Sequence, residues 1–228
     1  MDRRIPNPDR LCTYCKMKKM RFSIILLAAF ISFQAWGQTR LTEAQQKQIV
    51  EKIDRSAQRM TTMQCTFTQT KSMKMLSKKM ISKGVMYFKR PSQLRWQYTS
   101  PYDYTFLLNG DKIRLKSAKS TKDISVQGNK MFRQITNIIL NSITGGSLRS
   151  TSDFRLEMYK TGNTYFARLY PKKKELKQVY QIIEIYFSPA LDCVSSVKMI
   201  EKSGDTTLVE LNGIKYNASI NEKMFSLR

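Results

Sequence analysis

The most informative chemical feature of the sequence is that none of its 228 residues is a histidine. This excludes Ser-His-Asp and Cys-His nucleophilic catalysis, histidine-ligated zinc and acid–base catalysis by imidazole. The carboxylates do not cluster, and a pair such as Asp103 and Asp111 is better explained by turn formation than by acid–base chemistry. Gly145-Gly146 is not followed by the Lys-Ser/Thr of a phosphate-binding loop, and no spacing of Tyr, Lys and Ser singles out a catalytic trio. These residues point to no catalytic constellation, no cofactor and no metal site, and an enzyme would need clustered polar groups inside a pocket. That alternative stays open at this point, because Tyr, Lys and Ser side chains could still do chemistry.

The N-terminal region has the charge and hydropathy pattern of an export signal. A basic cluster at residues 16–21 precedes a mostly apolar stretch at 22–33, which is shorter than the roughly 20 residues of a membrane-spanning helix. Ala35 and Gly37 place small residues at the two positions that a signal peptidase reads. The sequence predicts cleavage between Gly37 and Gln38, with an uncleaved membrane anchor as the alternative.

The rest of the chain is expected to form one domain. Residues 1–16 fit no part of a signal peptide, and Met17 or Met20 would be an ordinary start, so an over-extended gene start is one interpretation of this stretch. No internal repeat and no Pro- or Ser-rich linker divides the chain after the signal segment. The prediction is a leader with signal peptide over 1–37 and a single domain over 38–228.

The four cysteines lie in two pairs along the chain. Cys12 and Cys15 form a lone CxxC in the leader, which is weak evidence for metal or redox chemistry. Cys65 and Cys193 belong to the predicted domain. In an exported protein these two could form one disulfide bond or remain buried free thiols, and the sequence leaves both possibilities open.

Two segments have the spacing of amphipathic helices. Thr42 and Gln45 have the spacing of a capping box, and apolar side chains recur at helical intervals over residues 43–60. A second helix is expected to begin after Asn129 and to end at Gly145-Gly146. Its apolar stripe consists of Phe132, Ile135, Ile138, Ile139 and Ile143.

Most of the remaining chain alternates polar and apolar residues with a period of two, which is typical of half-buried strands. Short turns separate these segments, and Asn109-Gly110 is the strongest hairpin signal among them. The sequence predicts nine or ten antiparallel strands in a meander. They cover residues 63–68, 84–88, 94–98, 104–108, 112–115, 154–159, 164–170, 179–187, 194–200 and 206–211.

The strong positive charge restricts the choice of partners. Forty Lys and Arg residues face 17 Asp and Glu residues, a net charge of +23, with basic runs at 71–89 and 172–174. A nucleic-acid-binding sheet would carry an RNP-type aromatic signature, which is absent, and the export signal leads away from nucleic acid. Two explanations remain: attraction to anionic lipid head groups or acidic partners, at about 1 kcal/mol per basic residue near a membrane, or a generally soluble surface.

One continuous segment carries a family resemblance. Residues 84–101 read GVMYFKRPSQLRWQYTSP, in which a glycine-containing strand runs into Lys-Arg-Pro, followed by Leu-Arg-Trp and a further proline. This segment resembles the outer-membrane lipoprotein carrier family, the LolA-type periplasmic chaperones. The Phe67-Thr68-Gln69 strand, the hairpin at 109–112 and the ending at 220–227 are similar to the corresponding parts of that family.

The resemblance implies a fold of the α+β class that is mostly β, an incomplete antiparallel β-barrel whose hydrophobic concave side is covered by a helical lid. It implies a monomeric periplasmic chaperone that carries the acyl chains of lipoproteins from the inner to the outer membrane and catalyses nothing. Its partners would be acylated lipoproteins as cargo, an inner-membrane lipoprotein-releasing transporter and an outer-membrane acceptor, with no nucleic acid. The arginine of the Lys-Arg-Pro step, here Arg90, would bond backbone groups of the lid and keep it closed.

The candidate cavity residues come from alternating strand positions and from the second helix. Because alternation defines two faces without showing which one is inward, the set is a hypothesis about a shared apolar surface. An alternative function with the same fold is a lipid- or lipoprotein-sensing module in envelope assembly. The candidate cavity residues are Phe67, Val85, Tyr87, Leu94, Trp96, Phe106, Ile135, Ile138 and Ile139.

Overall fold

The computed structural model describes residues 37–128, 148 and 153–227, and the structural description is limited to these. Gln38–Arg228 forms one compact unit, distinct from Met1–Gly37. The predicted signal segment and the predicted second helix, with Ile135, Ile138 and Ile139, lie outside the described residues. Within the described part, no helix combines the length and apolar character needed to cross a membrane.

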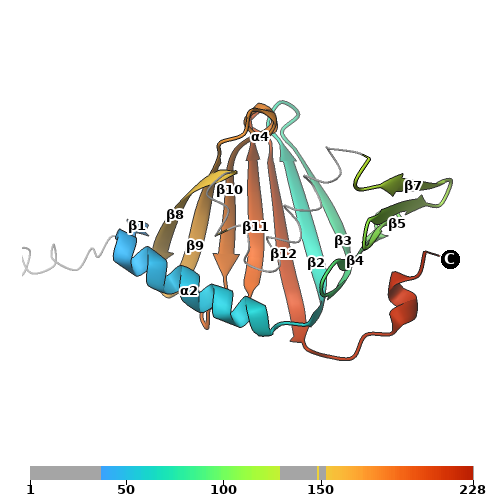
Figure 1. Cartoon of the computed structure of the whole chain (residues 1–228). Helices are drawn as coiled ribbons and strands as arrows, with labels where there is room; N and C mark the ends of the chain where they lie inside the picture. The colour runs from blue at the N-terminus through green and yellow to red at the C-terminus, as the bar shows by residue number, and fades with distance from the viewer. Residues whose placement is uncertain (1–36, 129–147, 149–152, 228) are drawn as a thin grey trace, which may run out of the picture. The chain divides into compact units, whose positions relative to one another are not determined.

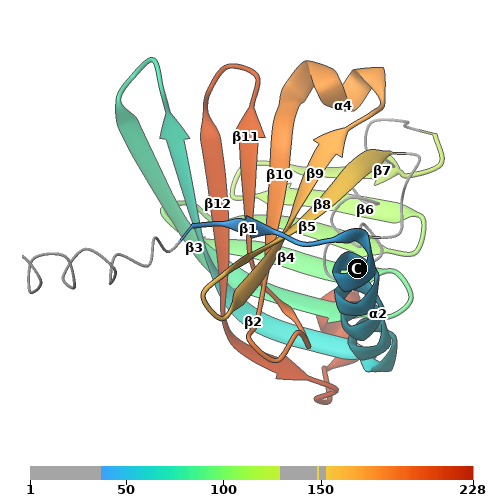
Figure 2. The ribbon, with the colours of Figure 1, turned by 90° about the vertical axis from the view of Figure 1, so that its left-hand side faces the viewer.

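Twelve antiparallel strands make up a single sheet (Figures 1 and 2). Their bounds are β1 (Thr39–Arg40), β2 (Thr62–Met73), β3 (Lys78–Lys89), β4 (Gln93–Ser100), β5 (Tyr104–Asn109), β6 (Lys112–Ser117), β7 (Thr121–Ser125), β8 (Phe154–Thr161), β9 (Thr164–Pro171), β10 (Tyr180–Phe187), β11 (Val194–Glu201) and β12 (Thr206–Tyr216). Neighbouring strands follow the chain from β2 to β7 and from β8 to β12, and the two runs join where β12 pairs with β2.

The predicted mostly-β class and antiparallel meander are confirmed. Within the described residues the sheet ends at β1 and β7, so it is open, as expected of an incomplete barrel. These two edge strands are the ones that the sequence did not predict. β1 has two residues, and β7 is exposed at four of its five positions, so neither offers the alternation that marks a half-buried strand.

Helix α2 (Glu43–Arg59) runs across one face of the sheet (Figures 1 and 2). The capping box forms as predicted: the Gln45 backbone N–H donates to Thr42 Oγ1 at 3.4 Å, and the Thr42 backbone N–H donates to Gln45 Oε1 at 3.0 Å. Ile53 and Ala57 are the buried residues of this 17-residue helix. The helix therefore contacts the sheet through a narrow stripe and leaves most of its surface polar.

Two apolar clusters lie on the sheet face that α2 covers. Directly paired residues of an antiparallel sheet have their side chains on the same face. The strand register therefore shows which residues of each strand face α2. The first cluster joins Ile53 of α2 to strands β8 to β11 and contains Phe154, Met158, Ala167, Leu169, Ile183, Ile185, Phe187 and Val194. The second spans the end of α2 and strands β2 to β6, and contains Met60, Met63, Cys65, Phe67, Met86, Phe88, Leu94, Leu108 and Ile113.

Two short helices complete the described fold. Helix α4 (Lys174–Val179) connects β9 to β10, and the 3₁₀ helix η3 (Glu222–Phe225) comes after β12. Phe225 is buried, and its carbonyl oxygen accepts a hydrogen bond from Asn109 Nδ2 at 3.0 Å. Because Asn109 lies one position from the inward-facing Leu108, the C-terminal segment is held on the opposite face from α2.

Candidate functional site

Arg90, in the turn between β3 and β4, connects the sheet to the end of α2. Its Nε donates to the carbonyl oxygen of Met60 at 2.7 Å, and a terminal guanidinium nitrogen donates to that of Ala57 at 2.8 Å. The last carbonyl groups of a helix lack partners within the helix and carry partial negative charge. The guanidinium group bonds the carbonyl of Ala57 in the last turn, which also accepts from the Met60 N–H, and the carbonyl of Met60, the residue after the helix. Arg90 therefore caps the C-terminus of α2 and anchors it to the sheet.

These two bonds bear on the predicted latch. The backbone N–H of Arg90 also donates to Thr61 O at 2.9 Å, so both backbone and side chain fix the passage from α2 to β2. The partners that the structure describes all belong to α2 and to the two residues after it. The predicted lid helix after Asn129 lies outside the described residues, so a bond from Arg90 to that segment stays a prediction.

Four of the candidate cavity residues share the face that α2 covers. Leu94 pairs with Leu108 and Trp96 pairs with Phe106, while Trp96 also pairs with Met86, the partner of Cys65. Phe67 is buried beside them, with its ring centroid 4.5 Å from that of Trp96. Leu94 is buried as well, whereas Trp96 and Phe106 remain partly exposed at the edge of the cluster. The structure thus brings Phe67, Leu94, Trp96 and Phe106 onto one surface.

The prediction that Val85 and Tyr87 share this cavity face is wrong. They pair with Thr66 and Gln64, which alternate with the inward-facing Met63, Cys65 and Phe67. Successive side chains of a strand point to opposite faces. Val85 and Tyr87 therefore lie on the outer face of the sheet, while Met86 and Phe88, one position along, face α2.

Gly84 is a residue of this face whose role the sequence pattern alone did not explain. A Cβ atom on Gly84 would lie 2.0 Å from the Gln97 carbonyl oxygen and 2.5 Å from the Phe67 ring. Phe67 and Gly84 are direct cross-strand partners, so the aromatic ring fills the space over the glycine. The glycine of the Gly-Val-Met-Tyr-Phe strand is thus required by the packing of Phe67.

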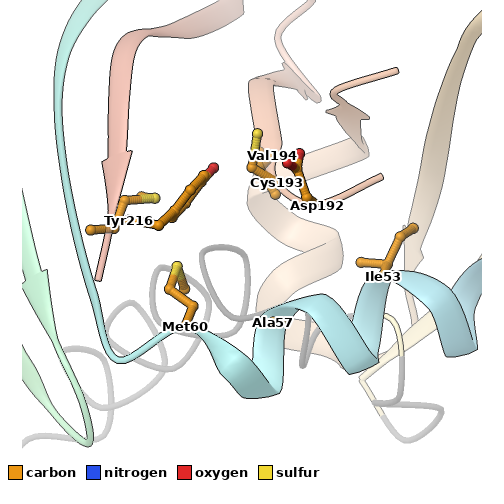
Figure 3. A pocket seen from close by; sticks show the side chains of 8 residues that line it. Ile53, Ala57, Met60, Asp192, Cys193, Val194 and Tyr216 are labelled. Carbon is orange, nitrogen blue, oxygen red and sulfur yellow. The ribbon is translucent and has the colours of Figure 1, made fainter. Parts of the chain in front are cut away.

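A small cavity lies between α2 and the sheet, at the junction of the two apolar clusters. Figure 3 shows Met60 of α2's end, Tyr216 of β12 and Cys193 pointing toward a common space. The cavity measures about 10 Å³, roughly the space that one water molecule needs. It is therefore too small for an acyl chain. Its lining consists of Ile53, Ala57, Met60, Met63, Asp192, Cys193, Val194 and Tyr216.

Both cysteines of the domain are free thiols in the structure. Burial is the main cause that raises the pKa of Cys65 to about 12, and burial also raises the pKa of Cys193 above its usual value. Thiols with such pKa values stay protonated at neutral pH and are poor nucleophiles. Among the described residues no group of three or more Cys, Asp or Glu side chains is arranged to hold a metal ion.

A larger pocket opens between the first half of α2 and strand β8. It measures about 330 Å³, and its apolar lining residues are Val50, Leu148, Phe154 and Leu156. Its polar lining residues are Glu43, Gln46, Lys47, Arg155 and Lys172, and three of these five are basic. Volumes of this order are typical of small-molecule sites, and a lining that combines apolar and basic side chains suits an apolar chain that ends in an anionic or polar group.

Comparison with known proteins places the chain in a family. Residues 58–228 match the family described as "Outer membrane lipoprotein carrier protein LolA". The chain belongs to the LolA family. The matched region includes Arg90 and Gly84. It also includes the residues of both apolar clusters except those of α2 that precede residue 58.

Individual relatives of this LolA-family chain are distant. It is 21% identical over 202 residues to an outer-membrane lipoprotein carrier protein of Pseudomonas paraeruginosa, covering 89% of this chain and 93% of the relative. A carrier protein of Methylococcus capsulatus is 22% identical, covering 72% and 76%. A LolA superfamily protein from Nitrosomonas europaea has a solved structure that is 10% identical, with a TM-score of 0.42, covering 79% of this chain and 96% of that one.

Several residues of the two cavities were missed by the sequence analysis. Met60 and Ile53 belong to the predicted helical stripe, so their burial was signalled, but their neighbours Cys193 and Tyr216 are distant in sequence. The 330 Å³ pocket likewise joins α2 to β8 and to Leu148. No local pattern marks such contacts, because they arise only when β8–β12 fold back against β2.

Proposed function

We propose that this chain is a periplasmic carrier that binds the acyl chains of lipoproteins on the sheet face beneath α2 and transfers them from the inner to the outer membrane without catalysing a reaction. The observation that carries the proposal is a lightly attached helix over an apolar face. Ile53 and Ala57 are the buried side chains of α2, and Arg90 supplies a polar anchor at its end. The family match supports lipoprotein cargo.

The free energy that holds the end of α2 on the sheet is similar to the free energy gained by burying an acyl chain there. Helix α2 can therefore act as a cover that cargo displaces. Exposing Ile53 costs about 1.5–3 kcal/mol, and each hydrogen bond that Arg90 makes to a carbonyl contributes about 1.5–3 kcal/mol. Lifting the end of α2 therefore costs several kcal/mol. An acyl chain gains about 0.8 kcal/mol per buried CH₂, so roughly ten CH₂ groups offset this cost. Cargo can bind by displacing the cover, and the returning cover favours release.

The partners of this cycle follow from the family resemblance. Acylated lipoproteins are the proposed cargo, an inner-membrane lipoprotein-releasing transporter the donor, and an outer-membrane protein the acceptor. The pocket of about 330 Å³ beside α2 is the proposed entry point for the first acyl chain, because its apolar lining residues belong to, or pack against, the cluster on β8 to β11. The protein is proposed to act as a monomer after cleavage of its signal peptide between Gly37 and Gln38.

The test compares the wild-type protein with Arg90→Leu and Arg95→Leu variants recovered from the cell envelope. Bound lipid and lipoprotein are measured by native mass spectrometry and lipid extraction. Arg90→Leu removes bonds that favour the cargo-free arrangement, so we expect at least about 10-fold more bound lipoprotein per protein, equivalent to one lost charge-assisted bond. Arg95 is a half-buried arginine on the outer face, bonded to Gln97 and Met224, so its replacement is the matched control.

Two results would contradict the proposal. If wild type and Arg90→Leu are both free of lipid, and neither takes up lipid when it is offered, the carrier function is wrong and the sensing or envelope-assembly alternative gains support. If Arg90→Leu and Arg95→Leu retain equal amounts of cargo, Arg90 has no specific role as a latch.

A further inference from the structure

The exposed large apolar side chains are concentrated at one end of the sheet. Six such side chains are exposed in the described part of the chain, and four of them lie at residues 75–81 of the hairpin that joins β2 to β3. Met75 is 95% exposed and Leu76 is 67% exposed. Val179, at the end of α4, is also exposed. Exposing Met75 and Leu76 to water at the apex of a hairpin does not stabilise the fold. Their exposure therefore indicates an interaction site.

The hairpin extends past the strands beside it. Pairing of β3 with β4 ends at Lys83, so residues 78–82 of β3 are paired with β2 alone in the described sheet. Pairing of β2 with β12 ends at Ser72, so residues 74–77 form an apex beyond the last paired position of β12. Both views show the β2–β3 hairpin, the β11–β12 turn and α4 at the same end of the sheet (Figures 1 and 2). We call residues 74–81, 172–179 and 202–205 together the hairpin end.

Hydrogen bonds join the three parts of the hairpin end. The backbone N–H of Lys74 donates to Asp205 Oδ1 at 3.0 Å, which ties the hairpin apex to the β11–β12 turn. The backbone N–H of Lys202 donates to the carbonyl oxygen of Val179 at 2.9 Å, which ties that turn to α4. The exposed apolar residues are therefore held on a continuous, ordered surface.

The charge of the hairpin end is strongly positive. Its three segments contain eight lysines and two carboxylates, Glu175 and Asp205. Lys78 and Lys79 are neighbours on β3, so their side chains point to opposite faces of the two-stranded hairpin. The apolar apex consequently has ammonium groups on both sides. The eight lysines are Lys74, Lys78, Lys79, Lys172, Lys173, Lys174, Lys177 and Lys202.

We propose that the hairpin end is a docking surface for an anionic lipid bilayer, with Met75 and Leu76 entering the boundary between head groups and acyl chains. Apolar side chains surrounded by lysines are the combination that binds such membranes, because lysines attract lipid phosphates while apolar groups leave water. Two apolar side chains at the apex and two on the adjoining part of β3 offer less contact than the ~800 Å² per partner of a stable protein interface. A fluid lipid layer needs no complementary surface.

Vesicles without lipoprotein test this inference separately from cargo binding. Protein recovered after export is sedimented with vesicles of phosphatidylglycerol and phosphatidylethanolamine, and with vesicles of phosphatidylcholine. Met75→Ser with Leu76→Ser is expected to weaken binding to the anionic vesicles about 10- to 100-fold, as two apolar side chains no longer enter the lipid. Lys74→Gln with Lys78→Gln and Lys79→Gln is expected to weaken it on the order of 100-fold.

A matched control uses three exposed lysines on another hairpin. Lys116→Gln with Lys119→Gln and Lys122→Gln, on the β6–β7 hairpin, makes the same change in net charge and is expected to leave vesicle binding within about 2-fold of wild type. Circular dichroism checks that every variant is folded, and cargo retention is expected to be unchanged in all of them.

A fluorescent reporter distinguishes insertion from simple charge attraction. In Leu76→Trp, the emission at position 76 is expected to shift to shorter wavelength with anionic vesicles and to remain unshifted with phosphatidylcholine. The inference is overturned if the control variant loses as much binding as the hairpin variant. It is also overturned if Met75→Ser with Leu76→Ser binds like wild type, since the surface would then attract charged partners, such as acidic proteins, without entering lipid.

Discussion

The two halves of the covered sheet face are built from different kinds of side chain. On β8 to β11 the cluster is largely aliphatic, with Ile183, Ile185 and Leu169 each at most 2% exposed. On β2 to β6 it is rich in aromatic rings and methionine, and Trp96, Tyr98 and Phe106 at its margin are only partly buried. Branched aliphatic side chains pack in few arrangements, whereas methionine adapts to irregular space.

One sheet face can therefore combine a fixed part with an adaptable part. The aliphatic half holds α2 through Ile53 and so sets the position of the cover. In the aromatic half the Phe67 ring contacts the rings of Trp96 and Tyr98, and the Tyr98 hydroxyl donates a hydrogen bond to Gln69 Oε1 at 3.0 Å. We expect stability to depend more on the first half and cargo binding more on the second.

The largest expected effect comes from Gly84, at the centre of the aromatic half. Gly84→Val places side-chain atoms against the Gln97 backbone and the Phe67 ring, where even a Cβ would lie at 2.0 Å and 2.5 Å. We expect a loss of at least about 3 kcal/mol in the free energy of unfolding, or failure to fold, from forced displacement of β4 and Phe67. Urea denaturation measures it.

Gly110→Ala is the control for this change. Gly110 has a positive φ of 60°, and a Cβ atom added to it would meet no other atom within 4 Å, so its replacement adds only backbone strain of about 1–2 kcal/mol. Equal losses for the two glycine variants would show that the Phe67 packing over Gly84 has no special importance.

A pair of alanine substitutions compares the two halves directly. Ile185→Ala removes a side chain that is 1% exposed in the aliphatic half, and we expect a loss of about 2–5 kcal/mol in unfolding free energy. Phe106→Ala removes a partly exposed ring, and we expect a smaller loss of stability but a larger loss of bound lipid. Denaturation and lipid extraction of both proteins give the two quantities, and the reverse order would contradict the division between the halves.

The smallest expected effect concerns the outer face of the aliphatic half. Burial alone would raise the pKa of Glu157, but hydrogen bonds from Tyr159 and Arg155 and the charges of Arg155 and Arg40 hold it below its ordinary value. A carboxylate with a lowered pKa in the folded state stabilises the fold above its unfolded pKa of about 4.3, and this contribution disappears as pH falls through the folded value.

Glu157→Gln therefore tests a pH-dependent contribution. We expect the variant to be less stable than wild type by about 1 kcal/mol at pH 7, with the difference shrinking below about pH 4 as Glu157 becomes protonated. Urea denaturation from pH 7 to pH 3 measures it, with Glu222→Gln, at an exposed carboxylate paired with Lys89, as the control. A difference that stays constant with pH would show that ionisation of Glu157 does not stabilise the fold.

Local patterns in the sequence predicted most of the fold. The capping box of Thr42 and Gln45, the Asn109-Gly110 turn and the alternation along the longer strands each depend on residues within a few positions of one another. The two strands that were not predicted, β1 and β7, lack such a local pattern. A two-residue strand such as β1 is too short to alternate, and β7 is an exposed edge with little apolar content.

The candidate site was predicted less completely because it depends on which face is inward and on distant contacts. Alternation separates Val85 from Met86 but does not show which of the two faces α2; the register with β2 and the burial of Met86 decide that. Arg90 was selected from a family motif, but its partners Ala57 and Met60 lie about thirty residues earlier and became identifiable only in three dimensions.

The position of β12 in the middle of the sheet has a consequence for how the chain folds. Strands β2 to β7 form by local hairpins, yet β2 lacks its other neighbour until β12, the last strand, is available. Contacts between such distant segments close late and slow folding. During synthesis the N-terminal half therefore presents an unpaired strand edge until residue 216 emerges, which is a hazard for association between nascent chains. Lys71 on β2 and the four lysines of neighbouring β3 place positive charge near this edge, and repulsion between like charges opposes association of nascent chains.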